Sequence, residues 1–205
     1  MAVALDIIIQ FVEGKMTVEE FQKELQTNSG LIEILSENIA EASAHLTRDR
    51  LYDYIKRCNT NTLGGLVDIL GELRKFLVTQ QVTFKFNEEP RNLFGLMLDS
   101  MPAYLDMDVD VNSTFFINQI VPIIEQEITK TEKKKQIREK FKSLFQYQSK
   151  PPRWIQSPEW LTKGDTPLFF VGQVDLKHSS FHDNGAVYVF LDTKSGEIKT
   201  VQQFY

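Results

Sequence analysis

Cysteine is nearly absent from this chain of 205 residues, which contains only Cys58. A single thiol excludes an internal disulfide bond and the zinc sites that need several cysteines, and it fits a reducing compartment. The fold therefore depends on a hydrophobic core, and a chain of this length is long enough to bury one.

Long uncharged hydrophobic runs are also lacking. The apolar start of the sequence, residues 1–12, is interrupted by Asp6 and Gln10 and is too short to cross a bilayer. It has neither the basic first region nor the small-residue cleavage site of a secretory signal. We therefore expect a soluble cytoplasmic protein without a membrane partner.

Negative charge prevails overall but is unevenly distributed. The formal net charge is −5, yet residues 1–129 hold 20 acidic and 10 basic side chains, and residues 130–153 hold 9 basic and 2 acidic ones. The acidic first part favours a cationic partner over nucleic acid or an anionic membrane.

Hydrophobic residues recur at helical spacing through about the first 147 residues. The expected helices cover residues 2–12, 17–27, 31–46, 51–58, 63–77, 90–101 and 113–147. Thr17 and Glu20 have the spacing of a capping box, which predicts the start of the second helix. Gly64, Gly65 and Gly71 lie inside an expected helix, and they predict the close approach of another helix there.

The pattern changes after residue 148. Residues 150–160 (KPPRWIQSPEW) combine prolines with Trp154 and Trp160 and cannot be helical throughout. Alternating β-branched and aromatic residues then predict strands over 168–176, 186–192 and 197–204, the last two joined in a hairpin. The sequence thus predicts an α+β fold, with a helical region at 1–148 and the Pro/Trp segment and antiparallel sheet at 149–205, packed as one unit.

No catalytic constellation is evident in the sequence. Glycine-rich phosphate loops are missing, and His178, His182 and Asp183 form the one histidine cluster. These three could hold a metal in a hydrolase, but their expected place is a loop between strands, where Asp183 can simply order a turn. Cys58 and His45 lack a partner that would make a nucleophile, and a half-buried Cys58 is the simpler interpretation. We assign no catalytic residue, metal or cofactor.

The densest negative charge is the alternation of Asp106, Asp108 and Asp110 with apolar residues. The spacing is that of the first residues of a calcium loop, but the glycine and glutamate that such a loop needs further on are absent. Two interpretations stay open: an anionic patch for a basic partner, or an edge strand or loop kept soluble by charge. Glu88 and Glu89 are a second, weaker candidate for binding a partner.

Positive charge concentrates between Lys130 and Lys142. A nucleic-acid-binding regulator is one interpretation of this stretch. However, Ile137, Phe141 and Phe145 share one helical face, as expected for a solvated helix with one buried side. The acidic remainder of the chain also disfavours nucleic acid.

The two tryptophans of the Pro/Trp segment have a structural interpretation. Rigid prolines can place such side chains over a sheet, where each buries about 150–250 Å². We expect this for at least one of Trp154 and Trp160.

Several strings of the sequence resemble the C-terminal signature of a family of small bacterial immunity proteins from polymorphic and contact-dependent toxin systems. They are residues 150–160, 167–173 (PLFFVGQ), 182–192 (HDNGAVYVFLD) and 201–205 (VQQFY), and residues 11–21 and 63–66 look similar too. The resemblance implies a cytoplasmic protein that binds and blocks a cognate toxin. It transfers no binding residue, because immunity surfaces differ among relatives.

An acidic inhibitor would be steered toward a toxin that is cationic around a nuclease active site. The sequence therefore predicts a non-enzymatic immunity protein that binds through Asp106, Asp108 and Asp110, with Glu88 and Glu89 as secondary contacts. The metal-dependent hydrolase and the nucleic-acid-binding regulator remain as alternatives.

Overall fold

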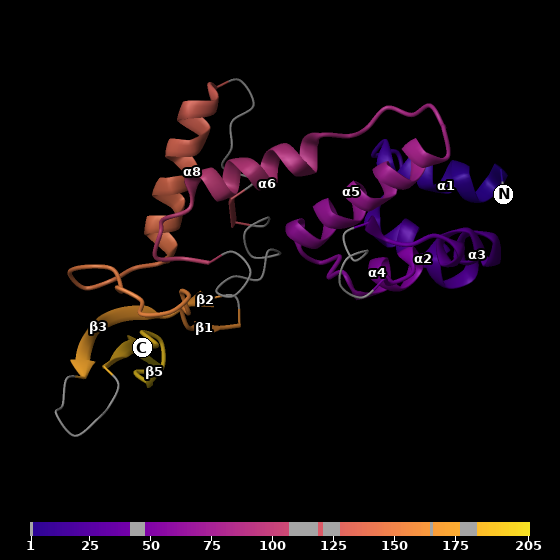
Figure 1. Cartoon of the computed structure of the whole chain (residues 1–205). Coiled ribbons are helices and arrows are strands. Elements are labelled where there is room, and N and C mark those ends of the chain that lie inside the picture. Colours follow the sequence, from indigo (N-terminus) through magenta and orange to yellow (C-terminus); the bar gives the residue numbers. More distant parts are fainter. Residues whose placement is uncertain (1, 42–47, 107–118, 121–127, 165, 177–183) are drawn as a thin grey trace. The chain divides into compact units, whose positions relative to one another are not determined.

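The computed structural model describes residues 2–41, 48–106, 119–120, 128–164, 166–176 and 184–205 (Figure 1). Helices precede the strands, as expected for the α+β class. The helices are α1 (Ala2–Val12), α2 (Val18–Thr27), α3 (Ser29–Glu37), α4 (Leu51–Arg57), α5 (Leu63–Thr79), α6 (Glu89–Ser100) and α8 (Lys130–Leu144). The strands are β1 (Thr162–Lys163), β2 (Thr166–Pro167), β3 (Phe169–Leu176), β4 (Gly185–Leu191) and β5 (Ile198–Phe204). Over these described ranges, no helix combines the length and the apolar character that crossing a bilayer requires.

The chain divides into two compact units, Met1–Phe94 and Gly95–Tyr205. The sequence placed a boundary near residue 148 instead. The difference arises because α8 belongs with the strands: just after it, Tyr147 forms a β-bridge with Phe170, and Phe145 meets the ring of Trp160 edge-on at 5.4 Å. Helical periodicity marks where helices lie but not which unit they join.

Local signals define the helices of the first unit. The capping box is confirmed: the Thr17 hydroxyl accepts from the Glu20 N–H at 3.2 Å, and the Glu20 carboxylate accepts from the Thr17 N–H at 2.8 Å. The helix expected over 31–46 ends early, at Glu37. It ends there because Ile39 leaves the helix and forms a β-bridge with Arg50.

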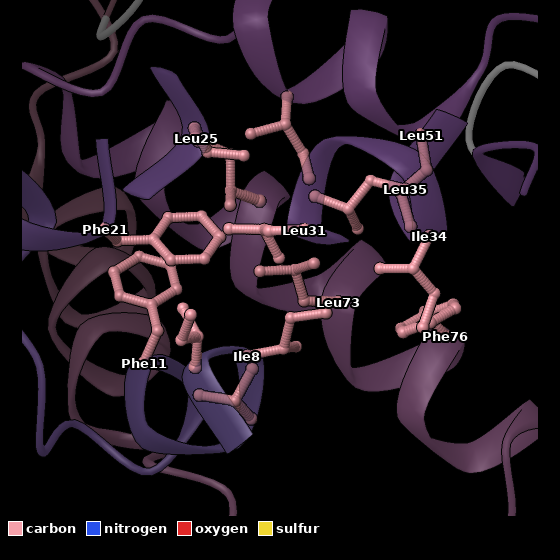
Figure 2. Close-up of a cluster of buried hydrophobic side chains, with 14 of the residues drawn as sticks. Ile8, Phe11, Phe21, Leu25, Leu31, Ile34, Leu35, Leu51, Leu73 and Phe76 are labelled. Carbon is pink, nitrogen blue, oxygen red and sulfur yellow. The ribbon is translucent and has the colours of Figure 1, made fainter. Parts of the chain in front are cut away.

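The core of the first unit is mainly aliphatic (Figure 2). Ile8 of α1, Leu31 and Leu35 of α3 and Leu73 of α5 are fully buried in it. Phe11 and Phe21 stack with parallel rings 4.0 Å apart, which joins α1 to α2. Each helix thus contributes one apolar face to a shared interior.

The expectation that another helix approaches the glycines of α5 is met at one of the three, since Gly64 faces α6. A side chain at Gly65 would collide with the backbone oxygen of Asn59, so this glycine lets the preceding loop approach the helix. Gly64 faces the ring of Phe94 at ordinary contact distance, and a Cβ at Gly71 would meet no atom within 4 Å. Of the three, only Gly65 is required by close backbone packing.

The second unit contains an antiparallel sheet in the order β3–β4–β5. The predicted hairpin of β4 and β5 is confirmed, with Leu191 opposite Ile198 and Gly185 opposite Phe204. Gly196 adopts φ +74° in its turn, a conformation that favours glycine. Alternation directs Tyr188 and Phe190 of β4 to one face and the intervening valines to the other.

Aromatic rings dominate the core of the second unit. Trp160 is 2% exposed, and its ring lies within 6.0 Å of the rings of Phe145, Phe170 and Phe190. From α8, Ile137 and Phe141 are fully buried. The expected apolar face of this basic helix is therefore the side that packs in the core.

Candidate functional site

Residues 150–160, called the strap below, cross one face of the sheet and are held there by polar side chains of the strands. The carboxamide oxygen of Gln203 accepts from the N–H groups of Ile155 and Gln156 at 3.1 and 3.0 Å, and its NH₂ donates to Ser157 O at 2.9 Å. Because the Gln203 side chain is itself buried, these bonds supply the partners that its carboxamide group loses with water.

Tyr188 of β4 also holds the strap on the sheet. Its hydroxyl accepts from the Ile155 N–H at 3.0 Å and donates to the Arg153 carbonyl at 2.9 Å. Burial raises the pKa of Tyr188, so the hydroxyl keeps the proton that the donated bond needs. Gln203 and Tyr188 therefore have a structural role: they hold the strap on the sheet.

The tryptophans of the strap act as anchors, which confirms their structural interpretation. The Trp160 indole N–H donates to Leu168 O at 2.9 Å. The Trp154 indole N–H donates to Tyr104 O at 2.9 Å, and its ring lies 4.4 Å from that of Tyr188. The most distinctive string of the sequence thus stabilises the fold and presents no reactive group.

The opposite face of the sheet, called the outer face below, is open and mainly apolar. It carries the residues that alternate with the buried ones, with Val174 59% exposed, Leu176 38%, Ile198 66% and Phe204 44%. The strand register places Val174 beside Val187 near one end of the face and Ile198 beside Leu191 near the other, with Val189 of β4 between them and the exposed Thr200 and Gln202 of β5 at their side. A contiguous exposed apolar patch is typical of a protein–protein contact.

Glu88 and Glu89 are both exposed at the start of α6. Glu88 pairs with Arg74 at 3.5 Å, and the Glu89 N–H donates to the Asn87 side chain at 3.1 Å. An acidic residue in a first turn also interacts favourably with the helix dipole. Glu88 and Glu89 therefore have local structural roles, while their carboxylates remain accessible.

Of the three aspartates, the structure describes only Asp106. It is half-buried and follows the buried Leu105. Asp108 and Asp110 lie outside the described residues, so whether the three form one anionic patch stays a prediction.

The basic helix α8 has its charges partly paired within its own unit. The Lys134 ammonium lies 2.7 Å from the Asp99 carboxylate, and this hydrogen bond lowers the pKa of Asp99. Lys142 pairs with Glu139 at 3.2 Å. These pairs favour the solvated-helix interpretation over nucleic-acid binding. A capping box of Thr129 and Glu132 begins α8, so the helix expected over 113–147 is interrupted at Thr129; the Thr-x-x-Glu spacing in the sequence is the signal for this start.

Few residues in the described ranges could bind a metal or act as a nucleophile. No group of three or more His, Cys, Asp or Glu side chains suited to a metal is found there. His178, His182, Asp183 and His45 lie outside these ranges. Cys58 is half-buried against the core of the first unit, as expected, and burial raises the pKa of its thiol. A raised pKa makes a thiol less nucleophilic at neutral pH.

Comparisons of the chain with protein-family models, with curated proteins and with solved structures found no match.

Proposed function

We propose that the chain is a non-enzymatic immunity protein that binds a cognate toxin domain in the cytoplasm and neutralises it by protein–protein contact. The outer face of the sheet is the observation that carries the proposal. Interfaces combine an apolar centre with a polar rim, and this face offers apolar side chains on a rigid sheet.

The roles of the signature residues are consistent with this function. The strings that resemble immunity proteins supply the strap, its anchors and the strands that hold it. A shared signature of scaffold residues fits a family whose binding surfaces differ from member to member. Val174, Leu176 and Ile198 of the outer face, and the acidic residues, lie outside these strings and would then vary with the toxin.

Charge supports a basic, nuclease-type toxin as the partner. Asp106, Asp108 and Asp110, with Glu88 and Glu89 as secondary contacts, would attract a cationic active-site groove and accelerate association. Such steering is strong at low ionic strength and weakens as salt screens it. The apolar face would supply most of the affinity, and the carboxylates most of the association rate.

The test is a titration of the full chain with an inactive form of the toxin domain encoded next to its gene. We expect a Kd on the order of 1 nM or below, as in other standard-size inhibitor interfaces. Substituting Val174 and Ile198 by lysine should weaken binding at least about 100-fold, because charge would enter the apolar centre. Val78→Lys is the matched control, since Val78 is similarly exposed, at 61%, on α5 of the other unit.

A second set of variants tests the charge assignment. Reversing Asp106, Asp108 and Asp110 to lysine should slow association and reduce its salt dependence. An unchanged rate and salt dependence would exclude these residues as contacts. Turnover of a substrate by the pure protein, lost on a single substitution, would overturn the non-enzymatic function itself.

A further inference from the structure

A pocket of about 380 Å³ opens on the first unit beside α5. Its lining includes Val67, Leu70, Gly71, Arg74, Phe86 and Arg91. The first four are spaced i, i+3, i+4 and i+7 and therefore share one side of α5. The pocket lies within a single unit and uses none of the outer face.

The floor of the pocket is apolar and has unfilled space at its centre. Leu70 is buried and Val67 half-buried, and a Cβ at Gly71 would meet no atom within 4 Å. Glycine inside a helix lowers helix stability relative to alanine, and packing against the protein's own atoms does not require it here. The space above Gly71 can accept an apolar group of a few carbon atoms.

The rim of the pocket is cationic. The Arg74 guanidinium lies 4.8 Å from the centre of the Phe86 ring, a cation–π contact that orients it. Its ion pair with Glu88 is long, at 3.5 Å, and both side chains are nearly half exposed, so a competing anion can displace the glutamate. Arg91 has no ion pair with any other residue that the structure describes.

We propose that this pocket binds a group that joins a small apolar body to a carboxylate. The body would occupy the space above Gly71, and the carboxylate would bind between Arg74 and Arg91, where guanidinium groups can form paired hydrogen bonds to it. The volume is near the lower end of the range for small-ligand pockets. The group can belong to a free organic acid or to the C-terminal residue of a peptide. Both carry negative charge, so this ligand differs in charge from the proposed basic toxin, and the two proposals share only Glu88 at the rim.

Calorimetric titration of the full chain at low salt tests the chemistry. The probes are 4-phenylbutyrate, its neutral amide, acetate, and a tetrapeptide ending in phenylalanine with a free or an amidated C-terminus. We expect phenylbutyrate to bind at least tenfold more tightly than its amide and than acetate. Tighter binding of the free-ended peptide than of phenylbutyrate would identify a peptide C-terminus as the source, and the reverse would identify a free acid. The proposal would be overturned if neither phenylbutyrate nor the free-ended peptide bound at 5 mM. It would also be overturned if phenylbutyrate and its neutral amide bound equally well.

Variants locate the binding. Gly71→Leu fills the space and Arg91→Gln removes the free cation, so each should reduce phenylbutyrate affinity at least tenfold. Both variants should fold, because leucine is a better helix former than glycine and Arg91 is exposed. Glu88→Gln should increase affinity severalfold because it releases Arg74. Glu89→Gln changes the net charge equally next to it and is the control, expected to bind as the natural chain does. Unchanged affinity in both Gly71→Leu and Arg91→Gln would show that the acid binds elsewhere. Toxin binding measured on the same variants keeps the two proposals separate, because Gly71→Leu should leave it unchanged.

Discussion

The two units of the chain are stabilised by contacts of very different sequence separation. In the first unit, α2 begins where Thr17 and Glu20 cap each other across three residues, and its buried Phe21 and Leu25 are one helical turn apart. In the second unit, Gln203 holds backbone groups that precede it by 46 to 48 residues. Short-range patterns can therefore be interpreted from the sequence alone, whereas the contacts of the strap exist only once the sheet has formed.

The two cores also differ in how specific their packing is. Aliphatic side chains fill the first, and many pairs of leucine and isoleucine can pack interchangeably there. In the second, Trp160 has four aromatic rings around it, those of Tyr104, Phe145, Phe170 and Phe190, and its indole N–H donates a hydrogen bond to Leu168 O. The second unit should thus be more sensitive to single substitutions. Tryptophan emission reports on it selectively, since Trp154 and Trp160 are the chain's two tryptophans.

The largest expected effect comes from Trp160→Ala. Removing a fully buried tryptophan leaves a cavity and costs about 3–5 kcal/mol of unfolding free energy. It also leaves the Leu168 carbonyl without its donor. Urea unfolding followed by Trp154 emission and by far-UV circular dichroism measures this. Leu31→Ala is the counterpart in the aliphatic core; equal losses in the two variants would remove the contrast between the cores.

Gln203→Leu should have the next largest effect. It leaves the Gln156 N–H without its acceptor and the Ser157 carbonyl without its donor, at a cost of about 1–3 kcal/mol for each group that water does not reach, whereas the Ile155 N–H keeps the Tyr188 hydroxyl as acceptor. We expect the strap to detach before the sheet unfolds, with faster hydrogen exchange at the Gln156 amide in particular. Gln202→Leu, one residue away and exposed on β5, is the control and should change stability by less than about 0.5 kcal/mol. Equal exchange rates in the two variants would show that Gln203 does not hold the strap.

These differences explain how much could be predicted from the sequence. The α+β order, most helix bounds and the hairpin follow from periodicity, capping and turn residues, which act within a few positions. The unit boundary at Phe94 does not, because Phe145 and Tyr147 make contacts with Trp160 and Phe170 that no local pattern encodes.

The candidate site was less predictable for a related reason. Charge density identified Glu88 and Asp106, but not the partner Arg74 that faces Glu88 or the pocket behind that pair. The outer face required the strand register before its apolar side chains could be placed together.

Gly65 and Gly71 of α5 allow the same substitution to be compared at two places on one helix, with smaller expected changes in stability. Gly65→Ala should destabilise the first unit by about 1–2 kcal/mol, because the new Cβ collides with the Asn59 backbone. Gly71→Ala should stabilise it by about 0.5–1 kcal/mol, because alanine favours the helix and space is available. Thermal unfolding followed by far-UV circular dichroism measures both. Effects of the same sign would mean that space around the new Cβ does not decide the outcome.

The smallest expected effect is the pH dependence of the β4–β5 hairpin. The Lys163 ammonium, at 2.6 Å, and then the Ser195 hydroxyl and Lys194 N–H, hydrogen-bond the Asp192 carboxylate and hold its pKa well below the usual range. A carboxyl with a lowered folded-state pKa contributes stability above its unfolded pKa of about 3.9 and loses that contribution as the pH falls toward the folded value. Asp192→Asn should therefore unfold at lower urea concentration than the natural chain at pH 7, and the gap should narrow steadily below about pH 4. A gap that stays constant down to pH 2 would mean that the carboxylate charge contributes nothing to the difference, and no gap at pH 7 would mean that an amide serves the turn equally well. Because Lys163 is half exposed, high salt should weaken its share of the effect while leaving the hydrogen bonds within the turn intact.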